Sequence, residues 1–222
     1  MKAGRTLQEL AVELDRQNAA KKDYIVDAGA LTMTTQAEPQ LLVGGGSYPV
    51  PYGITDIAHR QIGSFLKIPA TYYDRMRREN PGLLAQNVNA WFEDNGDTKR
   101  MLRTMDGSAR ALLSDRYRRI DNFEIASAVL PIIGGIEDAR GESCELTDSR
   151  MYIKVVSPRT QAEVKVGDPV QAGVIVTNSE VGYGSVTVKP LIFRLVCSNG
   201  MVAESGAMRK YHVGRVNEAN ED

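Results

Sequence analysis

The sequence predicts an α+β fold, with N-terminal helices followed by an antiparallel sheet on which helices pack. Apolar residues recur at helical spacing in several stretches before residue 97, beginning with Leu7, Leu10 and Leu14. From Lys99 onward apolar and polar residues alternate, as they do in strands. The chain has 222 residues, 42% hydrophobic and 25% charged, which is enough to bury a core. We expect a helical arm over residues 1–22 and a single α+β domain over 23–222, helical over 55–97 and mainly sheet over 98–215.

The N-terminal half is expected to contain four helices and little sheet. Thr6 and Glu9 have the spacing of a capping box, which predicts a helix over residues 7–20. A short strand is predicted at 31–35, and the glycines and prolines of 44–52 predict a loop. Thr55 is suited to cap a second helix. The remaining helices are predicted at 55–66, 70–79 and 83–92.

The C-terminal half is expected to be mostly strands. Asp106-Gly107 is a two-residue hairpin signal between strands at 99–105 and 110–113. Asp121-Asn122 is suited to cap a helix over 123–133. Further strands are predicted at 150–156, where Ser157-Pro158 should end the strand, at 172–178, at 185–197, and as a short return at Met201.

Composition excludes several classes of protein. The formal net charge of -1 means that any binding of nucleic acid needs a local basic patch. Two isolated cysteines, Cys144 and Cys197, do not form a disulfide framework, and we expect both to be buried thiols. With two histidines and no Cys-x-x-Cys, no metal site and no cofactor are predicted. Neither a signal peptide nor an apolar run of about 18 residues is found, so we expect a cytoplasmic protein that does not contact membranes.

The densest cluster of positive charge lies between residues 99 and 119. If the predicted hairpin forms, alternation would place several arginines on one face, where they could neutralise phosphates. Tyr117 could stack on bases, with Trp91 and Phe92 nearby in sequence. The alternative is a solvated face whose arginines pair with acids elsewhere. The predicted nucleic-acid-binding residues are Lys99, Arg100, Arg103, Arg110, Arg116, Tyr117, Arg118 and Arg119.

Other sites have competing interpretations. The helices at 55–66 and 70–79 could form a helix-turn-helix that uses Arg75, Arg77 and Arg78, or an ordinary αα-hairpin. The turn from Asn178 to Gly184 could present Ser179 and Glu180 to a ligand, although turn chemistry alone explains its residues. No catalytic residue is predicted, since no known enzyme signature is present.

Several blocks carry a family resemblance. They are Leu113-Ser-Asp-Arg-Tyr-Arg-Arg-Ile-Asp-Asn, Val174-Ile-Val-Thr-Asn-Ser-Glu-Val-Gly-Tyr-Gly and Arg194-Leu-Val-Cys-Ser-Asn-Gly-Met, with Ala58-His-Arg-Gln-Ile-Gly and Arg209-Lys-Tyr-His-Val-Gly-Arg. Over residues 55–215 the chain resembles the phage/plasmid-like family known as domain of unknown function 932. The resemblance implies a setting in phages, prophages and plasmids within a bacterial host cell. Members of the family often continue with a helical tail after the last block, whereas this sequence stops at Asp222. The resemblance implies no established reaction.

The leading functional hypothesis is a phage or plasmid DNA-metabolism protein that binds single-stranded DNA, with annealing or recombination by a homo-oligomer as its extension. The alternatives are a helix-turn-helix regulator of duplex DNA, which would prefer a defined sequence, and a protein-binding module of phage–host conflict, which would bind no nucleic acid. A hydrolase is the weakest alternative and would require metal-dependent turnover.

Overall fold

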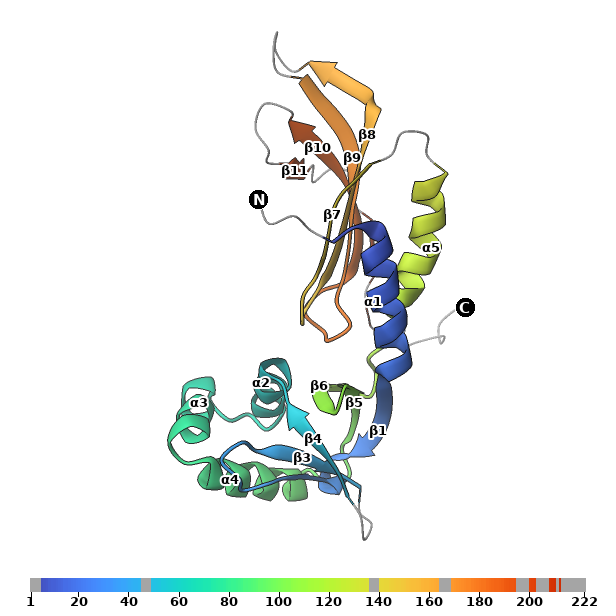
Figure 1. Cartoon of the computed structure of the whole chain (residues 1–222). Coiled ribbons are helices and arrows are strands. Elements are labelled where there is room, and N and C mark those ends of the chain that lie inside the picture. Colours follow the sequence, from blue (N-terminus) through green and yellow to red (C-terminus); the bar gives the residue numbers. More distant parts are fainter. Residues whose placement is uncertain are drawn as a thin grey trace, which may run out of the picture. The chain divides into compact units, whose positions relative to one another are not determined.

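The computed structural model describes residues 5–44, 49–135, 140–163, 169–194, 200–202, 208–210 and 212. The fold is α+β, as predicted, with the N-terminal helix first (Figure 1). Contacts group the chain into two compact units, residues 20–117 and residues 1–19 with 118–222. One domain over residues 23–222 was predicted after an N-terminal arm, whereas these contacts join residues 1–19 to residues 118–222.

The unit of residues 20–117 is a mixed six-stranded sheet that packs against three helices. The strand order is β1-β5-β6-β4-β3-β2, and β4 pairs with β6 in parallel while the other pairs are antiparallel. The strands are β1 (Lys22–Asp27), β2 (Leu31–Met33), β3 (Gln40–Val43), β4 (Val50–Ile54), β5 (Lys99–Met105) and β6 (Ser108–Ser114), with the 3-10 turn η1 (Ala28–Ala30) before β2. The helices are α2 (Asp56–Phe65), α3 (Ala70–Glu79) and α4 (Pro81–Asp94).

Local chemistry explains where these helices begin. The Thr55 hydroxyl accepts a hydrogen bond from the Ala58 amide at 3.2 Å, which confirms the predicted cap of α2. The Asn80 side chain accepts from the Leu83 amide at 3.0 Å, and Pro81 occupies the first helical position of α4. Because this cap lies at Asn80, α4 begins two residues before the predicted start.

The β5–β6 hairpin was predicted and is confirmed. Asp106 and Gly107 have φ values of 50° and 73°, the pair of positive angles that a type I′ turn requires. The register shifts after Arg103, which pairs with Ala111, whereas Thr104 pairs with Ala109. Arg110 is therefore the extra residue of a β-bulge.

Two expectations about proline were wrong. Residues 44–52 were expected to form a loop, yet β4 begins at Val50 and includes Pro51. The strand tolerates this proline, which has no amide hydrogen to donate, because β4 pairs with β6 only at Gly53 and Ile54. Ser157-Pro158 was expected to end a strand, yet β8 runs from Met151 to Glu163. The register shifts there, because Ser157 pairs with Ala172 and Gln161 with Gln171, so Pro158 has no partner on β9 that needs an amide hydrogen.

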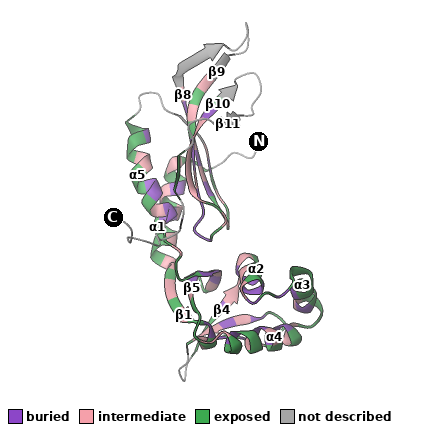
Figure 2. Ribbon diagram, turned by 180° about the vertical axis from the view of Figure 1, so that it is seen from behind, coloured by how far each residue is buried: buried purple, intermediate pink, exposed green. Residues whose placement is uncertain are grey.

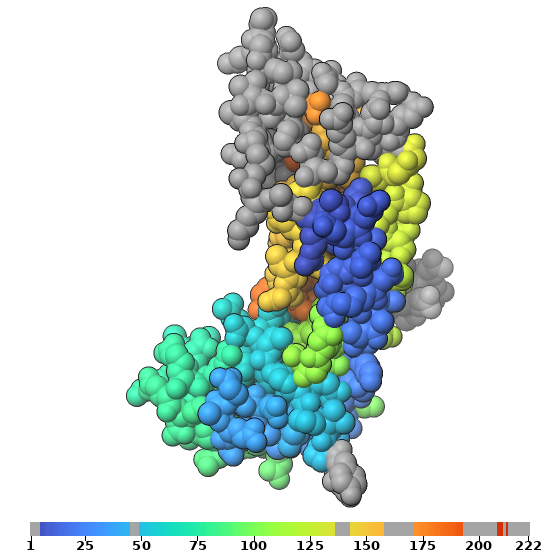
Figure 3. Space-filling view, in the orientation of Figure 1, coloured from blue at the N-terminus to red at the C-terminus, as the bar shows by residue number. Residues whose placement is uncertain are grey.

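The other unit is an antiparallel five-stranded sheet of order β11-β10-β9-β8-β7, with a short strand that also pairs with β10. Its strands are β7 (Arg140–Leu146), β8 (Met151–Glu163), β9 (Pro169–Asn178), β10 (Val186–Arg194), β11 (Gly200–Val202) and β12 (Met208–Lys210). The helices α1 (Leu7–Ala20) and α5 (Asn122–Gly134) both lie on one face of this sheet (Figure 1), and Figure 3 shows them side by side.

The core of this second unit lies between the two helices and the sheet. Leu10 and Leu14 from α1 and Ile125 from α5 pack against Met151 and Ile153 of β8. All five are buried, and Figure 2 shows buried stretches in purple on both α1 and α5. The capping box predicted for α1 is confirmed: the Thr6 amide donates to Glu9 at 2.8 Å, and the Glu9 amide donates to the Thr6 hydroxyl at 3.1 Å.

A buried ion pair joins β1 and β5 in the unit of residues 20–117. Arg103 lies directly opposite Asp23 in the strand register. Its Nε and Nη2 donate to the two carboxylate oxygens at 2.9 and 3.1 Å, and the two side chains are 1% and 8% exposed. The bidentate geometry compensates for the removal of both charges from water.

We expect Asp23→Asn to destabilise the protein by about 3–5 kcal/mol, because it leaves a buried guanidinium without its carboxylate. Urea denaturation followed by circular dichroism measures this loss. The matched control is Asp56→Asn, which breaks the exposed Asp56–Arg77 pair of 2.8 Å and should cost less than about 1 kcal/mol. Similar losses for both variants would contradict a special role of the buried pair.

Gly173 of β9 has no room for a side chain. A Cβ at this position would lie 2.3 Å from the Val155 carbonyl oxygen of the neighbouring strand β8. We expect Gly173→Ala to destabilise the protein by about 1–3 kcal/mol, because the backbone would have to move. Gly134→Ala in α5 meets no heavy atom within 4 Å and should change the denaturation midpoint little. Equal denaturation midpoints for the two variants would show that the backbone can move to accept a Cβ at residue 173 at little cost in stability.

Candidate nucleic-acid interface

The predicted basic cluster does not form one face of the β5–β6 hairpin. Alternation places Arg100 and Arg103 on opposite sides of β5. Arg103 is buried against Asp23 and is not available to a phosphate. Arg100 is half-buried on the helix-covered side, where its guanidinium lies 4.3 Å from the centre of the Phe65 ring. Burial lowers the pKa of Arg100, and its Nη2 donates to the Leu112 carbonyl at 3.5 Å.

The other members of the predicted cluster are divided between the two units. Arg110 is half-buried at the bulge, with its Nη1 3.6 Å from the Met105 sulfur. Lys99 and Arg116 are exposed and Tyr117 is half-buried in the first unit, whereas the exposed Arg118 and Arg119 belong to the second. Within the first unit, two of the six predicted residues are thus fully exposed.

The other predicted DNA contacts, one aromatic pair and the arginines of α3, are only partly available to a ligand. Phe92 is buried in the core, whereas Trp91 is 45% exposed. In α3, Arg75 pairs with Glu79 and Arg77 pairs with Asp56, each at 2.8 Å. Two of the three arginines proposed to contact DNA therefore already have carboxylate partners.

The unit formed by residues 1–19 and 118–222 contains a buried polar junction centred on Asn178. The Asn178 amide nitrogen donates to the Ile120 carbonyl at 3.0 Å and to Asn122 Oδ1 at 2.8 Å. The amide oxygen lies 3.0 Å from Nε2 of His212. The Asn178 side chain therefore joins the segment before α5, the end of β9 and the segment after β12. These are three of the motif blocks noted in the sequence.

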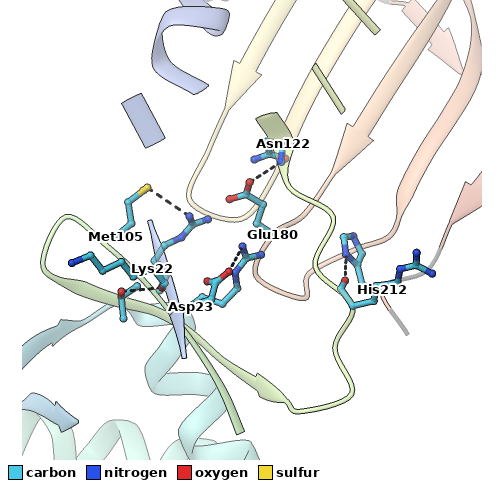
Figure 4. Close-up of polar contacts among 10 residues, drawn as sticks. Lys22, Asp23, Met105, Asn122, Glu180 and His212 are labelled. Carbon is cyan, nitrogen blue, oxygen red and sulfur yellow. Dashed lines mark hydrogen bonds and ion pairs between the residues drawn. The ribbon is translucent and has the colours of Figure 1, made fainter. Parts of the chain in front are cut away.

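Glu180 supplies the N-terminal cap of α5. Its Oε1 accepts a hydrogen bond from the Asn122 amide at 2.7 Å, as Figure 4 shows. Asp121 occupies the N-cap position, as predicted, but its side chain makes no capping hydrogen bond. A carboxylate at this place also interacts favourably with the helix dipole. The hydroxyl of the neighbouring Ser179 accepts from the Tyr183 amide at 2.9 Å and fixes the turn.

The polar side chains of this junction are buried and hydrogen-bonded. Asn178, Ser179, Glu180 and His212 are all nearly inaccessible to solvent. Each of them has a hydrogen-bond partner in a backbone group or in a neighbouring buried side chain, which is the condition for burying polar groups without a large cost. The turn that the sequence analysis considered for ligand binding thus fixes the chain instead.

A concavity lies next to the junction, on the sheet of the same unit. Its volume is about 360 Å³, and strands β8, β9 and β10 form its floor. It opens on the face opposite α1 and α5, because Met151 and Ile153 of β8 point into the helix-covered core while Tyr152 between them points the other way. We call it the basic concavity. It is lined by Arg150, Tyr152, Ile175, Thr177, Asn178, Gly184, Ser185, Thr187, Lys189 and Arg209.

Strand register brings these side chains together. Tyr152, Thr177, Thr187 and Arg209 are successive partners across β8, β9, β10 and β12. The hydroxyls of Thr177 and Thr187 lie 2.6 Å apart. Two residues further along β10, on the same face of the sheet, Lys189 is the register partner of Ile175.

The electrostatic character of the basic concavity is positive. Arg150, Lys189 and Arg209 line it, and none of its described lining residues is acidic. The Arg150 guanidinium is fixed, because its Nε donates to the Tyr183 carbonyl at 3.0 Å. The nearest carboxylate by register is the exposed Glu145 on β7, opposite Tyr152 and outside the concavity.

The basic concavity was not among the sites predicted from the sequence. Its three strands were predicted but their register was not, and Arg150, Lys189 and Arg209 are too far apart in sequence to form a cluster. The available signal was weak: polar residues at alternate positions of the strands, such as Thr187 and Lys189, mark the side of the sheet that does not face the helices.

Metal ligands, cysteines and membrane-spanning helices are the remaining features that bear on function. In the part of the chain that the structure describes, no three His, Cys, Asp or Glu side chains converge in a way that could hold a metal ion. Cys144 is buried, as predicted, and burial raises the pKa of its thiol to about 11. Cys197 lies outside the described residues. None of the described helices combines the length and apolar character that crossing a membrane requires.

Comparison with known proteins identifies one family. A model of the family described as Domain of unknown function (DUF932) matches residues 110–221, half of the chain. This range contains the buried junction and the basic concavity, and it begins after the Ala58–Gly63 block. Neither a curated protein nor a solved structure matches the chain. The match confirms the resemblance found in the motif blocks, and the chain belongs to the DUF932 family.

Proposed function

We propose that this protein binds single-stranded nucleic acid in the basic concavity of its five-stranded sheet. The observation that carries the proposal is the convergence of Arg150, Lys189 and Arg209 on one concavity with no acidic side chain among its described lining. Because the whole chain has a net charge of -1, such a local excess of positive charge is what binding to phosphates requires.

The other lining residues fit the same ligand. Tyr152 offers a ring on which a base can stack, and stacking tolerates any base. The hydroxyls of Thr177, Ser185 and Thr187 are donors and acceptors for phosphate or sugar oxygens. These residues lie on a sheet face, a surface on which single-stranded segments with unstacked bases are bound in other proteins.

The proposal keeps the ligand class expected from the sequence and changes the residues assigned to it. Single-stranded DNA remains the first ligand to test, with annealing by a homo-oligomer in phage or plasmid DNA metabolism as an extension. The basic concavity replaces the β5–β6 hairpin as the proposed interface, because Arg103 is paired in the interior and Arg100 packs on Phe65.

We expect Lys189→Gln with Arg209→Gln to weaken binding of a mixed-sequence single strand by about tenfold or more. Fluorescence anisotropy across a salt titration measures this change. Loss of two phosphate contacts should reduce the slope of log affinity against log salt by about 1.4, since each contact on a single strand contributes about 0.7.

The matched control is Lys99→Gln with Arg116→Gln, which removes the same charge from exposed positions near the hairpin. It should leave affinity and slope nearly unchanged. The opposite pattern would assign binding to the hairpin region and overturn the proposed site. Preference for one duplex sequence would favour a helix-turn-helix regulator, and absence of any binding would favour a protein-binding module.

Tyr152 provides a separate test of base stacking. We expect Tyr152→Leu to weaken single-strand binding by about 1–3 kcal/mol, because leucine retains apolar bulk but loses the aromatic face. The salt slope should stay unchanged, since no phosphate contact is removed. Trp91→Leu on α4 is the control, because this exposed ring lies outside the basic concavity. Equal effects of the two substitutions would contradict a stacking role for Tyr152.

A further inference from the structure

The strand that brings Arg209 to the basic concavity has little to hold it in place. β12 consists of three residues, all exposed, and pairs with β10 through backbone contacts at Val186, Thr187 and Val188. A strand of this length without buried side chains gains no hydrophobic stabilisation. A contact close to the strand in sequence can therefore act as its anchor.

His212 is that anchor. It follows β12 by two residues and is 7% exposed. Its backbone carbonyl accepts from the Arg118 amide at 3.1 Å. Its Nδ1 lies 3.1 Å from the Arg118 carbonyl oxygen, and its Nε2 lies 3.0 Å from Asn178 Oδ1. Figure 4 labels His212 and marks a contact of its ring with a dashed line. One residue therefore joins the segment after β12 to two other segments of the junction.

The hydrogen-bond pattern determines which form of the imidazole fits. The Ile120 carbonyl can only accept, so the side-chain nitrogen of Asn178 faces it and the side-chain oxygen faces His212. The Arg118 carbonyl on the other side of the ring is also only an acceptor. Both ring nitrogens must therefore carry a hydrogen, which only the cationic imidazolium provides.

Charged residues of the same unit lie in the segments that the junction joins. Glu180 and Asp121 are buried, and Glu180 accepts a hydrogen bond from the Asn122 amide. Among the described residues of these segments, Arg118, Arg119 and Lys210 are exposed to solvent.

We propose that the imidazolium of His212 is a positioning group, which anchors β12 and thereby holds Arg209 at the basic concavity, so that affinity for nucleic acid falls as pH rises. The effect on affinity rests on the proposed function, whereas the anchoring does not. As pH rises, the ring loses one hydrogen and one of its two side-chain hydrogen bonds becomes a contact between two acceptors. The anchor is thus present at low pH and lost at high pH, in accordance with His being the side chain that titrates in this range.

The experiment compares the full chain with His212→Gln between pH 6 and pH 8.5 at constant salt. In the unsubstituted protein, affinity for a labelled single strand should fall about three- to tenfold across this range, which is the effect of losing one Arg contact. His212→Gln should bind with the weaker affinity at every pH, because glutamine does not titrate. Addition of Arg209→Gln to His212→Gln should cause little further loss, since both act through the same contact. A pH-independent affinity in the unsubstituted protein, or a full additional loss in the double variant, would overturn the proposal.

His59→Gln is the matched control, because the chain has two histidines. Burial beside Arg77 lowers the pKa of His59 to about 4, so its charge does not change in this range. The pH profile of His59→Gln should therefore match that of the unsubstituted protein. If it became flat instead, the pH dependence would belong to His59 and not to His212.

Hydrogen exchange of the β12 amides separates this proposal from the proposed function. After correction for the intrinsic pH dependence of exchange, the amides of residues 208–210 should lose protection as pH rises in the unsubstituted protein. In His212→Gln they should be weakly protected throughout. If the protein binds no nucleic acid but shows this pattern, the proposed function fails and the anchor stands. If protection is equal in both proteins at every pH, the anchor fails whatever the binding result.

Discussion

The Asn178 amide is the interaction on which the arrangement of the family-matched half depends. A primary amide has two donors and an acceptor in fixed positions, and all are used between segments that are distant in sequence. Its burial means that no water can replace a lost partner easily. One side chain therefore sets the positions of the start of α5, the end of β9 and the residue after β12 relative to each other. Ile120 and Asn122, Asn178, and His212, which belong to three separate blocks of the sequence, thus meet at one buried amide.

Much of the fold could be predicted from the sequence, because helix caps and turn residues act locally. Thr6, Thr55 and the Asp106-Gly107 pair each fixed an element boundary that the structure confirms. Strand β1, with the sequence Lys-Asp-Tyr-Ile-Val-Asp, was missed, since its alternation is weak and its identity as a strand comes from pairing with β5. The prolines misled for a related reason: whether Pro51 interrupts a sheet depends on which neighbours the strand has, and this is not a local property.

The candidate site was predicted less well, for a physical reason. Charge density along the chain is a poor guide to charge density on a surface, because strands separate adjacent residues to opposite faces and join distant ones through register. Arg100 and Arg103 are three residues apart and have different environments, one on an aromatic ring and one against a carboxylate. Lys189 and Arg209 are twenty positions apart and line the same concavity. The total charge balance of the chain gave no indication of either arrangement.

The assignment of α1 to the unit that contains residues 118–222 has a consequence for the order of events during synthesis. This helix leaves the ribosome before residues 20–117, but the strands that cover Leu10 and Leu14 are made after them. Residues 20–117, in contrast, contain a complete sheet, three helices and their own core, and all their contacts within this unit are available once that segment has been translated. We therefore expect residues 20–117 to fold during translation, while the apolar side of α1 is still exposed to solvent. For that interval, α1 exposes the apolar side that carries Leu10 and Leu14, and a chaperone could shield it.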